Sequence, residues 1–348
     1  MLSRLLSSIT APAADHTAEA QRHLDSLTKP PGSLGRIEEL ALRMAVLRGG
    51  EPRAERPVIF TFAADHGVVA EGVSAYPQVV TAQMVENFLR GGAAVNVLAR
   101  QAGARVVVAD FGVAHPIGSS PALVSCPIAA GTANMAVGPA MRREQAVAAI
   151  EAGARLALDA LDAGADLLGT GEMGIGNTTA ASAITAAITG VAPERVTGRG
   201  TGVDAGALAR KVDVIRRALA VNAPDPRDGL DVLSKVGGFE IAGLVGVILA
   251  GASHRVPVAL DGFISGAAGL IAVTLAPETR HALFASHRSV EPGHAAVLGH
   301  LGLEPYLDLD MRLGEGTGAA LFVHLARAAS LIWSEMATFK SAGVSDKS

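Results

Sequence analysis

Two glutamates stand in glycine-rich runs of the sequence, where no bulky neighbour keeps a carboxylate from a ligand. Glu315 lies in the run Gly314–Gly318, and Glu172 lies in the run Gly171–Thr179. A carboxylate so placed can take a proton from a substrate as a general base. The alternative for Glu315 is an acid that only interacts with the dipole of the following helix. The two acids could belong to one site, and their separation in the sequence leaves this open.

The same glycine runs could bind a phosphate. Glycines before a helix leave backbone N–H groups accessible, and the positive end of the helix dipole favours an anion there. In the run Gly171–Thr179, Asn177 adds a side-chain donor, which favours a phosphate cradle. A tight strand–helix turn is an equally good interpretation. A further run, Gly198–Asp204, is followed by Lys211 on a predicted helix, and this lysine is either solvated or reaches a phosphate.

Histidine, serine and cysteine residues provide weaker signals. His66 follows a predicted strand and is either catalytic or, as we favour, a turn residue hydrogen-bonded to Asp65. Ser289 lies in the polar loop Ser286–His294, where it could contact a sugar or a phosphate. No His-x-x-x-His pair indicates a helical zinc site. The single cysteine, Cys126, excludes a disulfide framework and a thiolate metal cluster.

Several common motifs are absent. The run Gly171–Thr179 contains Gly-x-Gly-x-x-Thr and lacks the third glycine of a dinucleotide-binding fingerprint. The sequence contains no Gly-x-x-x-x-Gly-Lys-[Ser/Thr] phosphate loop and no Gly-x-Ser-x-Gly nucleophile elbow. It also has no adjacent pair of aspartates, which argues against a metal–pyrophosphate site. No metal site is predicted.

A parallel sheet would bring these residues together. Short apolar segments alternate with helical patterns of about 10–20 residues, which predicts such a sheet covered by helices. Ligands bind at the carboxyl ends of its strands, and Asp65, Asp110 and Asp261 follow or end predicted strands. The apolar segments are Val58–Phe62, Arg105–Asp110, Leu123–Ile128, Asp166–Thr170, Val256–Asp261 and Ala282–Ser286. The predicted helices are Thr17–Leu27, Leu34–Arg48 (capped by Ser33), Val79–Leu89, Ala93–Ala102, Arg142–Ala163, Thr178–Ile188, Ala205–Ala220 and Gly318–Ala337.

Composition excludes several classes of protein. The 348 residues include 29 Lys+Arg and 33 Asp+Glu, so the net charge is 29 − 33 = −4. With 49% hydrophobic and 18% charged residues, the chain is not intrinsically disordered. The mild negative charge argues against a nucleic acid partner. The two most apolar runs, Ile241–Ala252 and Gly262–Ala276, are shorter than the ~18 residues that suggest a membrane span. We therefore expect buried core elements and a cytoplasmic protein.

Five segments together resemble the motifs of a known family. They are Thr28–Arg36, Ala64–Val68, Gly171–Thr179, Ser286–His294 and Arg312–Gly318. Several long motifs in order are far more specific than one glycine triplet. In this combination the chain resembles the nicotinate-nucleotide–dimethylbenzimidazole phosphoribosyltransferases, which make the lower-ligand nucleotide of cobalamin.

The resemblance implies an α/β fold with a Rossmann-like parallel sheet, flanking helices and a small helical domain built from both chain ends. Residues 57–315 would form the large nucleotide-binding catalytic domain, and residues 1–56 and 316–348 the small one. A homodimer is implied, in which the neighbour's small domain helps to close each site. The implied reaction moves the 5-phosphoribosyl group from β-nicotinate mononucleotide to 5,6-dimethylbenzimidazole with inversion at C1′, and it needs no cofactor and no metal.

Matching the motifs also assigns residues. Glu315 becomes the general base that removes the benzimidazole N–H proton. The residues implied for the nucleotide and its phosphate are Glu172, Gly174, Gly176, Asn177, Lys211, Ser289 and Gly314. Those implied for the base pocket are Tyr76, Gln78, Glu86 and Met173. Glu86 is an acid in a pocket for an aromatic base, and Met173 stands where some relatives are expected to have leucine, so the preferred base stays open.

Two other classes of function remain. Another nucleotide enzyme on the same fold, such as a dinucleotide-dependent oxidoreductase, would need the missing third glycine. A non-catalytic nucleotide-binding homologue would be expected to lose the glutamate between glycines, and Glu315 is present. If Glu315 is not the base, Glu172 is the next candidate.

Overall fold

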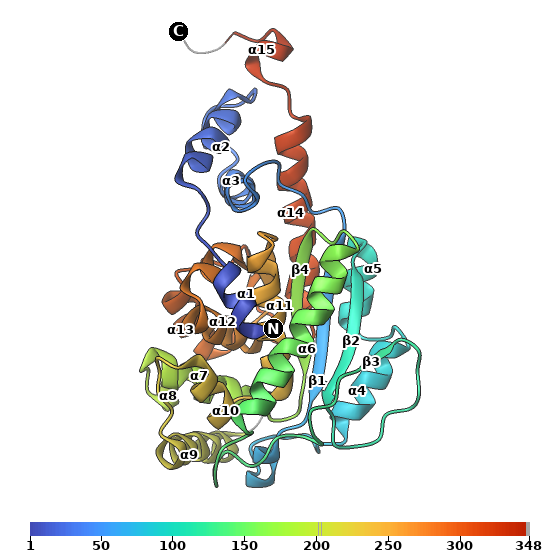
Figure 1. Ribbon diagram of the computed structural model, residues 1–348, viewed down its shortest axis with the longest axis vertical. Helices are drawn as coiled ribbons and strands as arrows, with labels where there is room; N and C mark the ends of the chain where they lie inside the picture. The colour runs from blue at the N-terminus through green and yellow to red at the C-terminus, as the bar shows by residue number, and fades with distance from the viewer. Residues whose placement is uncertain (201, 203, 346–348) are drawn as a thin grey trace.

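A six-stranded parallel sheet forms the centre of the protein (Figure 1), as a computed structural model describes it for residues 1–200, 202 and 204–345. The strand order is β3-β2-β1-β4-β5-β6, the order of a doubly wound nucleotide-binding sheet. The predicted parallel sheet is confirmed. The strands are β1 Pro57–Ala64, β2 Arg105–Gly112, β3 Leu123–Ser125, β4 Leu167–Met173, β5 Val258–Leu260 and β6 Leu283–Ala285, and a small parallel pair comprises β7 His287–Arg288 and β8 Leu307–Asp308.

The parallel register brings the carboxyl ends of β1, β2 and β4 to the same level. Ala63 of β1 is paired with Asp110 of β2 on one side and with Met173 of β4 on the other. The order of the strands reverses between β1 and β4, and ligands bind such sheets at this switch point. The segment predicted as Leu123–Ile128 ends as a strand at Ser125, because the regular register with β2 stops there. Beyond it, the Ile128 N–H donates to the Phe111 carbonyl out of step with the Asp110–Ser125 pair.

Helices cover both faces of the sheet and contain the two most apolar runs. Those runs form α11 and α12, which are almost entirely buried, so their prediction as core elements is confirmed. Within the described residues, no helix is long and apolar enough to cross a membrane. The helices are α1 Leu2–Ser8, α2 Ala14–Ser26, α3 Arg36–Arg48, η1 Gly67–Glu71, α4 Val80–Leu89, α5 Ala94–Ala102, α6 Arg143–Asp162, α7 Asn177–Thr189, α8 Pro193–Val196, α9 Ala205–Asn222, α10 Gly229–Val236, α11 Phe239–Ser253, α12 Phe263–Leu275, η2 Pro277–Ala282, α13 Pro292–Leu301, α14 Thr317–Glu335 and α15 Phe339–Ala342.

A group of helices from both chain ends lies beyond the amino ends of the strands (Figure 1). It contains α2, α3, α15 and the last turns of α14, and α14 continues from this group down to the sheet. Leu27 forms a bridge with Thr338, and the His23 ring lies 4.2 Å from that of Trp333. In contrast, α1 packs on α6 and α11. The division into two domains stays a prediction.

The loop between α2 and α3 is organised by a buried ion pair. Lys29 Nζ lies 2.7 Å from Glu38 Oε2, and the Glu38 carboxylate also accepts the N–H groups of Gly32 and Leu34. The predicted cap by Ser33 is wrong, since Gly35 is the N-cap residue of α3 and no side chain caps it.

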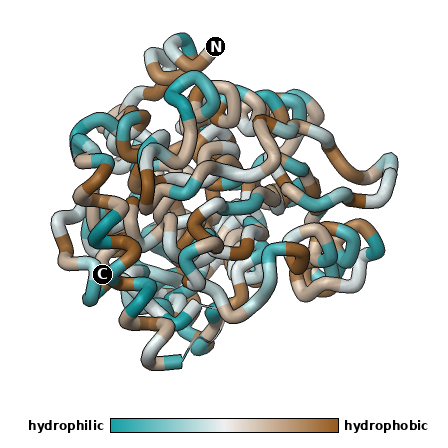
Figure 2. The backbone as a smooth tube through the Cα atoms, turned by 90° about the horizontal axis from the view of Figure 1, so that it is seen from below, coloured by the Kyte–Doolittle hydropathy of each residue, from teal (hydrophilic) through white to brown (hydrophobic). Residues whose placement is uncertain are grey.

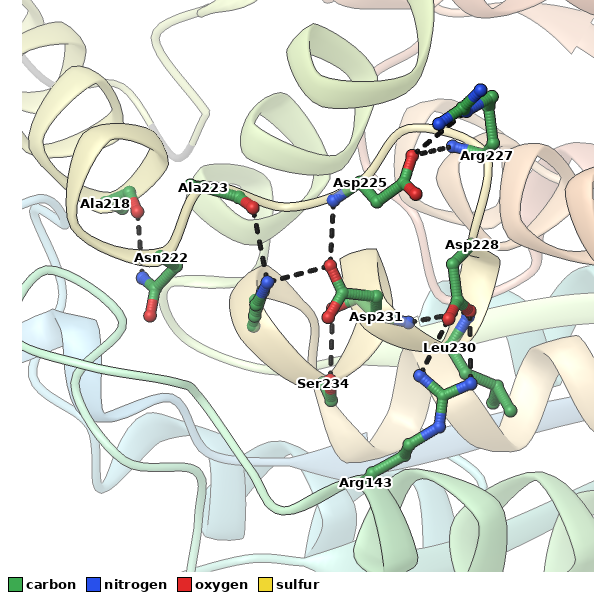
Figure 3. A network of polar contacts seen from close by, with 11 residues as sticks. Arg143, Ala218, Asn222, Ala223, Asp225, Arg227, Asp228, Leu230, Asp231 and Ser234 are labelled. Carbon is green, nitrogen blue, oxygen red and sulfur yellow. Dashed lines mark hydrogen bonds and ion pairs between the residues drawn. The ribbon is translucent and has the colours of Figure 1, made fainter.

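A surface network ties α10 to its neighbours (Figure 3). Asp228 caps α10 by accepting the N–H groups of Leu230 and Asp231, and it forms an ion pair of 2.9 Å with Arg143 of α6. Asp231 accepts the N–H of Asp225 in the loop that follows α9. The network holds this end of α6, α9 and α10 together.

Hydrophilic and hydrophobic residues are interspersed along the backbone when the protein is viewed from below (Figure 2).

The close contact of α6 and α11 depends on glycine. A side chain at Gly246 would collide with the carbonyl of Ile150, and one at Gly153 with the carbonyl of Gly243. We expect Gly246→Ala to lower the free energy of unfolding by about 1–3 kcal/mol through overpacking, as urea denaturation would measure. Gly299→Ala, in an exposed position of α13 with open space around it, is the control and should stabilise by about 0.4–1 kcal/mol. Equal midpoints for both variants would contradict this account.

Candidate active site

The glycine runs Gly171–Thr179 and Gly314–Gly318 interlock at the switch point. The Glu315 carbonyl accepts the hydroxyl of Thr61 on β1 at 2.8 Å. A side chain at Gly171 on β4 would collide with the same carbonyl. Glu315 itself has φ 66°, a left-handed conformation that non-glycine residues adopt at a cost and that is concentrated at functional sites. The two glutamate-bearing runs therefore belong to one site.

The Glu315 carboxylate is nearly buried, with 5% of the residue exposed. Its Oε2 accepts the N–H of Val95 in the first turn of α5 at 3.3 Å. Burial raises the pKa of Glu315, the charge of Asp261 adds to the rise, and the Val95 bond opposes it. Among the contacts of the described residues, Oε1 takes part in no hydrogen bond, which leaves an oxygen for a proton from a ligand.

Glu172 is a second buried carboxylate beside the Glu315 turn. Its Oε2 accepts a hydrogen bond from Asn177 Nδ2 at the start of α7. A side chain at Gly314 would collide with its Oε1. Burial raises the pKa of Glu172 well above its usual range, the charges of Glu240, Asp261 and Glu315 raise it further, and the bond from Asn177 lowers it. Burial and the neighbouring acids therefore favour the protonated form of Glu172.

The predicted bond between His66 and Asp65 is wrong. His66 Nε2 lies 2.7 Å from Glu240 Oε1, and both side chains are buried. Burial by itself would lower the pKa of His66, but the adjacent Glu240 carboxylate more than offsets it and the pKa is raised. The pair lies under the glycine loop, because a side chain at Gly174 would come within 3.3 Å of both partners.

Lys211 is buried rather than solvated, with 1% of the residue exposed. Its Nζ donates to Thr178 Oγ1 at 2.8 Å and to the Gly198 carbonyl at 3.3 Å. Burial lowers the pKa of Lys211 to about 8, and the charge of Glu291 opposes this. Since Thr178 follows Asn177, the first turn of α7 joins the lysine to the Glu172 cluster.

Ser289 lies on the same side of the site. Its N–H donates to His294 Nδ1 at 2.9 Å, and its hydroxyl accepts the N–H of Glu291 at 3.3 Å. Burial lowers the pKa of His294 to about 3, helped by the charges of His287 and Arg288, so this ring is a neutral acceptor.

The glycine run Gly198–Asp204 borders a cavity of about 390 Å³. Gly200 donates its N–H to Glu291 Oε1 at 3.0 Å, and its carbonyl accepts from Arg312 at 3.1 Å. In the run Gly171–Thr179, Gly176 is the N-cap residue of α7 and has φ 97°, a conformation that suits glycine. Thr201 and Val203 of the run lie outside the described residues.

The four residues assigned to a base pocket are less closely connected. Met173 ends β4 and is half-buried against the cluster that contains Val85 and Phe88. Gln78 Nε2 donates to the His66 carbonyl at 3.4 Å. Tyr76 is 52% exposed, and Glu86 forms an exposed ion pair with Arg90 at 3.4 Å. Their shared role in binding a base stays a prediction.

Two acids of the site had no assigned role in the sequence. Asp261 was recognisable only as an aspartate ending a strand, and Glu240 as a single charge at the start of an apolar helix after two glycines. A charge inside so apolar a segment is a usable signal, because a buried charge needs a partner. In the part of the chain that the structure covers, no three His, Cys, Asp or Glu residues are grouped to hold a metal ion.

A doubly wound sheet with carboxylates, a lysine and helix N-termini at its switch point defines a nucleotide-binding α/β enzyme. The family model described as "Phosphoribosyltransferase" matches residues 9–344. The chain is 60% identical over 338 residues to the nicotinate-nucleotide–dimethylbenzimidazole phosphoribosyltransferase of Chloroflexus aggregans, covering 97% of this chain and 96% of that one. It therefore belongs to the nicotinate-nucleotide–dimethylbenzimidazole phosphoribosyltransferase family.

Further relatives agree with this membership. The corresponding protein of Geobacter metallireducens is 55% identical over 345 residues, which is 99% of this chain and 98% of that one. The crystal structure of CobT from Thermus thermophilus is similar with a TM-score of 0.92 at 51% identity, covering 96% of this chain and all of that chain.

Proposed function

We propose that the protein transfers the 5-phosphoribosyl group from β-nicotinate mononucleotide to 5,6-dimethylbenzimidazole, forming α-ribazole 5′-phosphate and nicotinate. The family membership supports the reaction. The observation that carries the mechanism is the buried Glu315 carboxylate, which is held in a left-handed turn at the switch point and has one oxygen left for a ligand.

In this mechanism Glu315 is the general base. One benzimidazole nitrogen attacks C1′ while Glu315 takes the proton from the other nitrogen. The bond from C1′ to the nicotinate nitrogen breaks, and its electron pair returns to the cationic pyridinium ring. The leaving group thus needs no proton, and attack from the opposite face turns the β into the α configuration. The raised pKa of Glu315 favours this role, because burial makes the carboxylate a stronger base.

The phosphate is assigned to the Lys211 side of the site. The Lys211 ammonium, the hydroxyl of Thr178 and the N-terminal turn of α7 offer a charge and several donors in one place. Glu172, Gly174, Gly176, Asn177, Ser289 and Gly314 complete the proposed nucleotide site. Tyr76, Gln78, Glu86 and Met173 are proposed to line the pocket for the acceptor base.

A homodimer is part of the proposal. The helical group of α2, α3 and α15 lies beyond the amino ends of the strands, away from the carboxyl edge that carries the site (Figure 1). A small domain that closes this edge would therefore come from a second copy of the chain. Light scattering after size-exclusion chromatography should give twice the mass of the 35.2 kDa chain, and a monomer that turns over at full rate would contradict this part.

A turnover assay tests the reaction. Purified protein is mixed with nicotinate mononucleotide and dimethylbenzimidazole without added metal, and both products are followed by chromatography and mass spectrometry. Equal amounts of nicotinate and α-ribazole phosphate are expected. Nicotinate without the coupled product would indicate hydrolysis or another acceptor, and no release at all would favour a non-catalytic homologue.

Lys211→Met should weaken nucleotide binding. Loss of the charged hydrogen bonds removes about 1.5–3 kcal/mol, so kcat/KM for nicotinate mononucleotide should fall by about 10–150-fold. The loss should appear mainly in KM, because the phosphate is bound equally in the ground and transition states. Arg155→Met, which removes an exposed charge on α6, is the control and should match the wild type. An unchanged KM in Lys211→Met would remove the lysine from the phosphate site.

A further inference from the structure

Asp261 is a fully buried aspartate that lies between the strands and the turn carrying Glu315. It directly follows β5, and 1% of it is exposed. Its Oδ2 accepts the N–H of Gly316 at 3.0 Å, and its Oδ1 accepts those of Gly318 at 2.6 Å and Ala319 at 3.2 Å. One carboxylate thus binds three backbone donors at the start of α14.

These three donors belong to the residues that directly follow Glu315 in the chain. Gly316 is the next residue in the chain, and Gly318 and Ala319 belong to the first turn of α14. The φ of Glu315 is 66°, a strained conformation that persists only where neighbouring contacts impose it. The hydroxyl of Thr61 donates to the Glu315 carbonyl, which lies in the same peptide group as the Gly316 N–H. The peptide group that follows Glu315 is therefore anchored at both ends, because its carbonyl binds Thr61 on β1 and its N–H binds Asp261.

The position of Asp261 is itself well determined. Its carbonyl accepts the hydroxyl of Ser286, which also binds the Leu260 carbonyl at 2.6 Å. Its N–H lies 3.4 Å from Thr170 Oγ1 on β4. A side chain at Gly318 would collide with the His287 ring and approach Asp261 Oδ1, so the helix start can approach the aspartate only with glycine at this position.

We propose that Asp261 is a positioning residue for the transfer reaction, and that its carboxylate holds the Gly314–Gly318 turn so that Glu315 faces the acceptor base. The proposal rests on the proposed function of Glu315 as the general base. Burial raises the pKa of Asp261 to about 7 against the effect of its three N–H donors. The charge of Asp261 in turn raises the pKa of Glu315, which strengthens the base.

Asp261→Asn is the direct test. Asparagine has the same size but keeps one accepting oxygen, since the other is replaced by an N–H₂ group that can only donate. It therefore cannot accept from Gly316 and from Gly318 at the same time. A displacement of about 1 Å at a reacting group can cost about 10²-fold in rate, so kcat should fall by roughly 10²-fold. KM for nicotinate mononucleotide should change by less than about threefold, since Asp261 does not contact the phosphate side.

A double-mutant cycle separates positioning from general damage. If Asp261 acts through Glu315, the double variant Asp261→Asn/Glu315→Gln should be no slower than Glu315→Gln alone, within about threefold. Residues that act as a unit give such non-additive losses. A purely structural role would give losses that multiply.

Asp166→Asn is a matched control. Asp166 is also a buried aspartate that accepts two backbone N–H groups, from Glu55 at 3.0 Å and Arg56 at 2.8 Å. It precedes β4, at the edge of the sheet opposite the site. Asp166→Asn should lower the thermal midpoint, which circular dichroism measures. At temperatures where the variant is folded, its kcat should equal that of the wild type.

The outcomes are distinct. Wild-type protein without turnover refutes the proposed function before Asp261 is tested. Wild-type turnover together with an unchanged kcat in Asp261→Asn overturns the positioning role. A kcat that falls only in proportion to the folded fraction, or losses that multiply in the double variant, also overturn it. A large kcat loss in a folded Asp261→Asn, with unchanged KM and no further loss in the double variant, establishes the role.

Discussion

Replacing Glu315 by glutamine is expected to lower kcat by about 10²–10⁴-fold, the usual contribution of a positioned general base. This corresponds to roughly 2.7–5.4 kcal/mol of transition-state stabilisation. Glutamine keeps the size of the side chain and can still accept the N–H of Val95, so the turn should hold its shape. Binding of nicotinate mononucleotide, measured by isothermal calorimetry, should stay near the wild-type value.

The control for this variant is Glu278→Gln, which changes an exposed glutamate that forms an ion pair with the exposed His281. It should turn over at the wild-type rate. If Glu315→Gln also keeps the wild-type kcat, Glu315 is not the base and the role passes to Glu172, which is equally buried and whose pKa is also raised.

The pH dependence of kcat gives an independent check of the same assignment. The base must be ionised, and burial raises the pKa of Glu315 above its usual range. The rate should therefore fall as the pH decreases through that raised pKa. Glu172 and Asp261 titrate in the same cluster, so the apparent value belongs to the group of acids. Disappearance of this acid limb in Glu315→Gln would assign it to the base.

The sheet and most helices could be predicted from the sequence, because buried strands and amphipathic helices leave periodic apolar patterns. The predicted segments Val58–Phe62 and Arg105–Asp110 lie in β1 and β2, and Asp166–Thr170 overlaps β4 from Leu167 on. The two-residue strands β7 and β8 could not be predicted, since a pair of residues carries no period. The end of β3 was misplaced because pairing with β2, rather than hydropathy, decides where that strand stops.

The site was predictable in its parts and not in its contacts. Glycines on both sides of Glu315 marked the turn, because only small neighbours allow the close approach to Gly171. Lys211 gave no sign of burial, since a lysine on a helix after a loop is usually solvated. The partner of His66 lies 174 positions away, and no local pattern connects residues at such a distance.

Breaking the His66–Glu240 pair should cost about 3–5 kcal/mol of folding free energy, because it leaves a buried charge without a partner. His66→Ala is the variant, and chemical denaturation near pH 6 is the measurement. His281→Ala is the control: its pair with Glu278 at 3.1 Å is exposed on both sides, so the loss should be about 1 kcal/mol or less.

The pH dependence of this loss follows from the direction of the His66 shift. The Glu240 carboxylate overcomes the effect of burial and raises the pKa of His66, so the protonated histidine stabilises the folded state. This stabilisation is fully present below the unfolded pKa of about 6.5 and is lost as the pH rises through the higher folded pKa. The difference between wild type and His66→Ala should therefore shrink at alkaline pH. The double variant His66→Leu/Glu240→Met buries no charge and should recover most of the stability. If it is as unstable as His66→Ala, packing rather than the unpaired charge causes the loss.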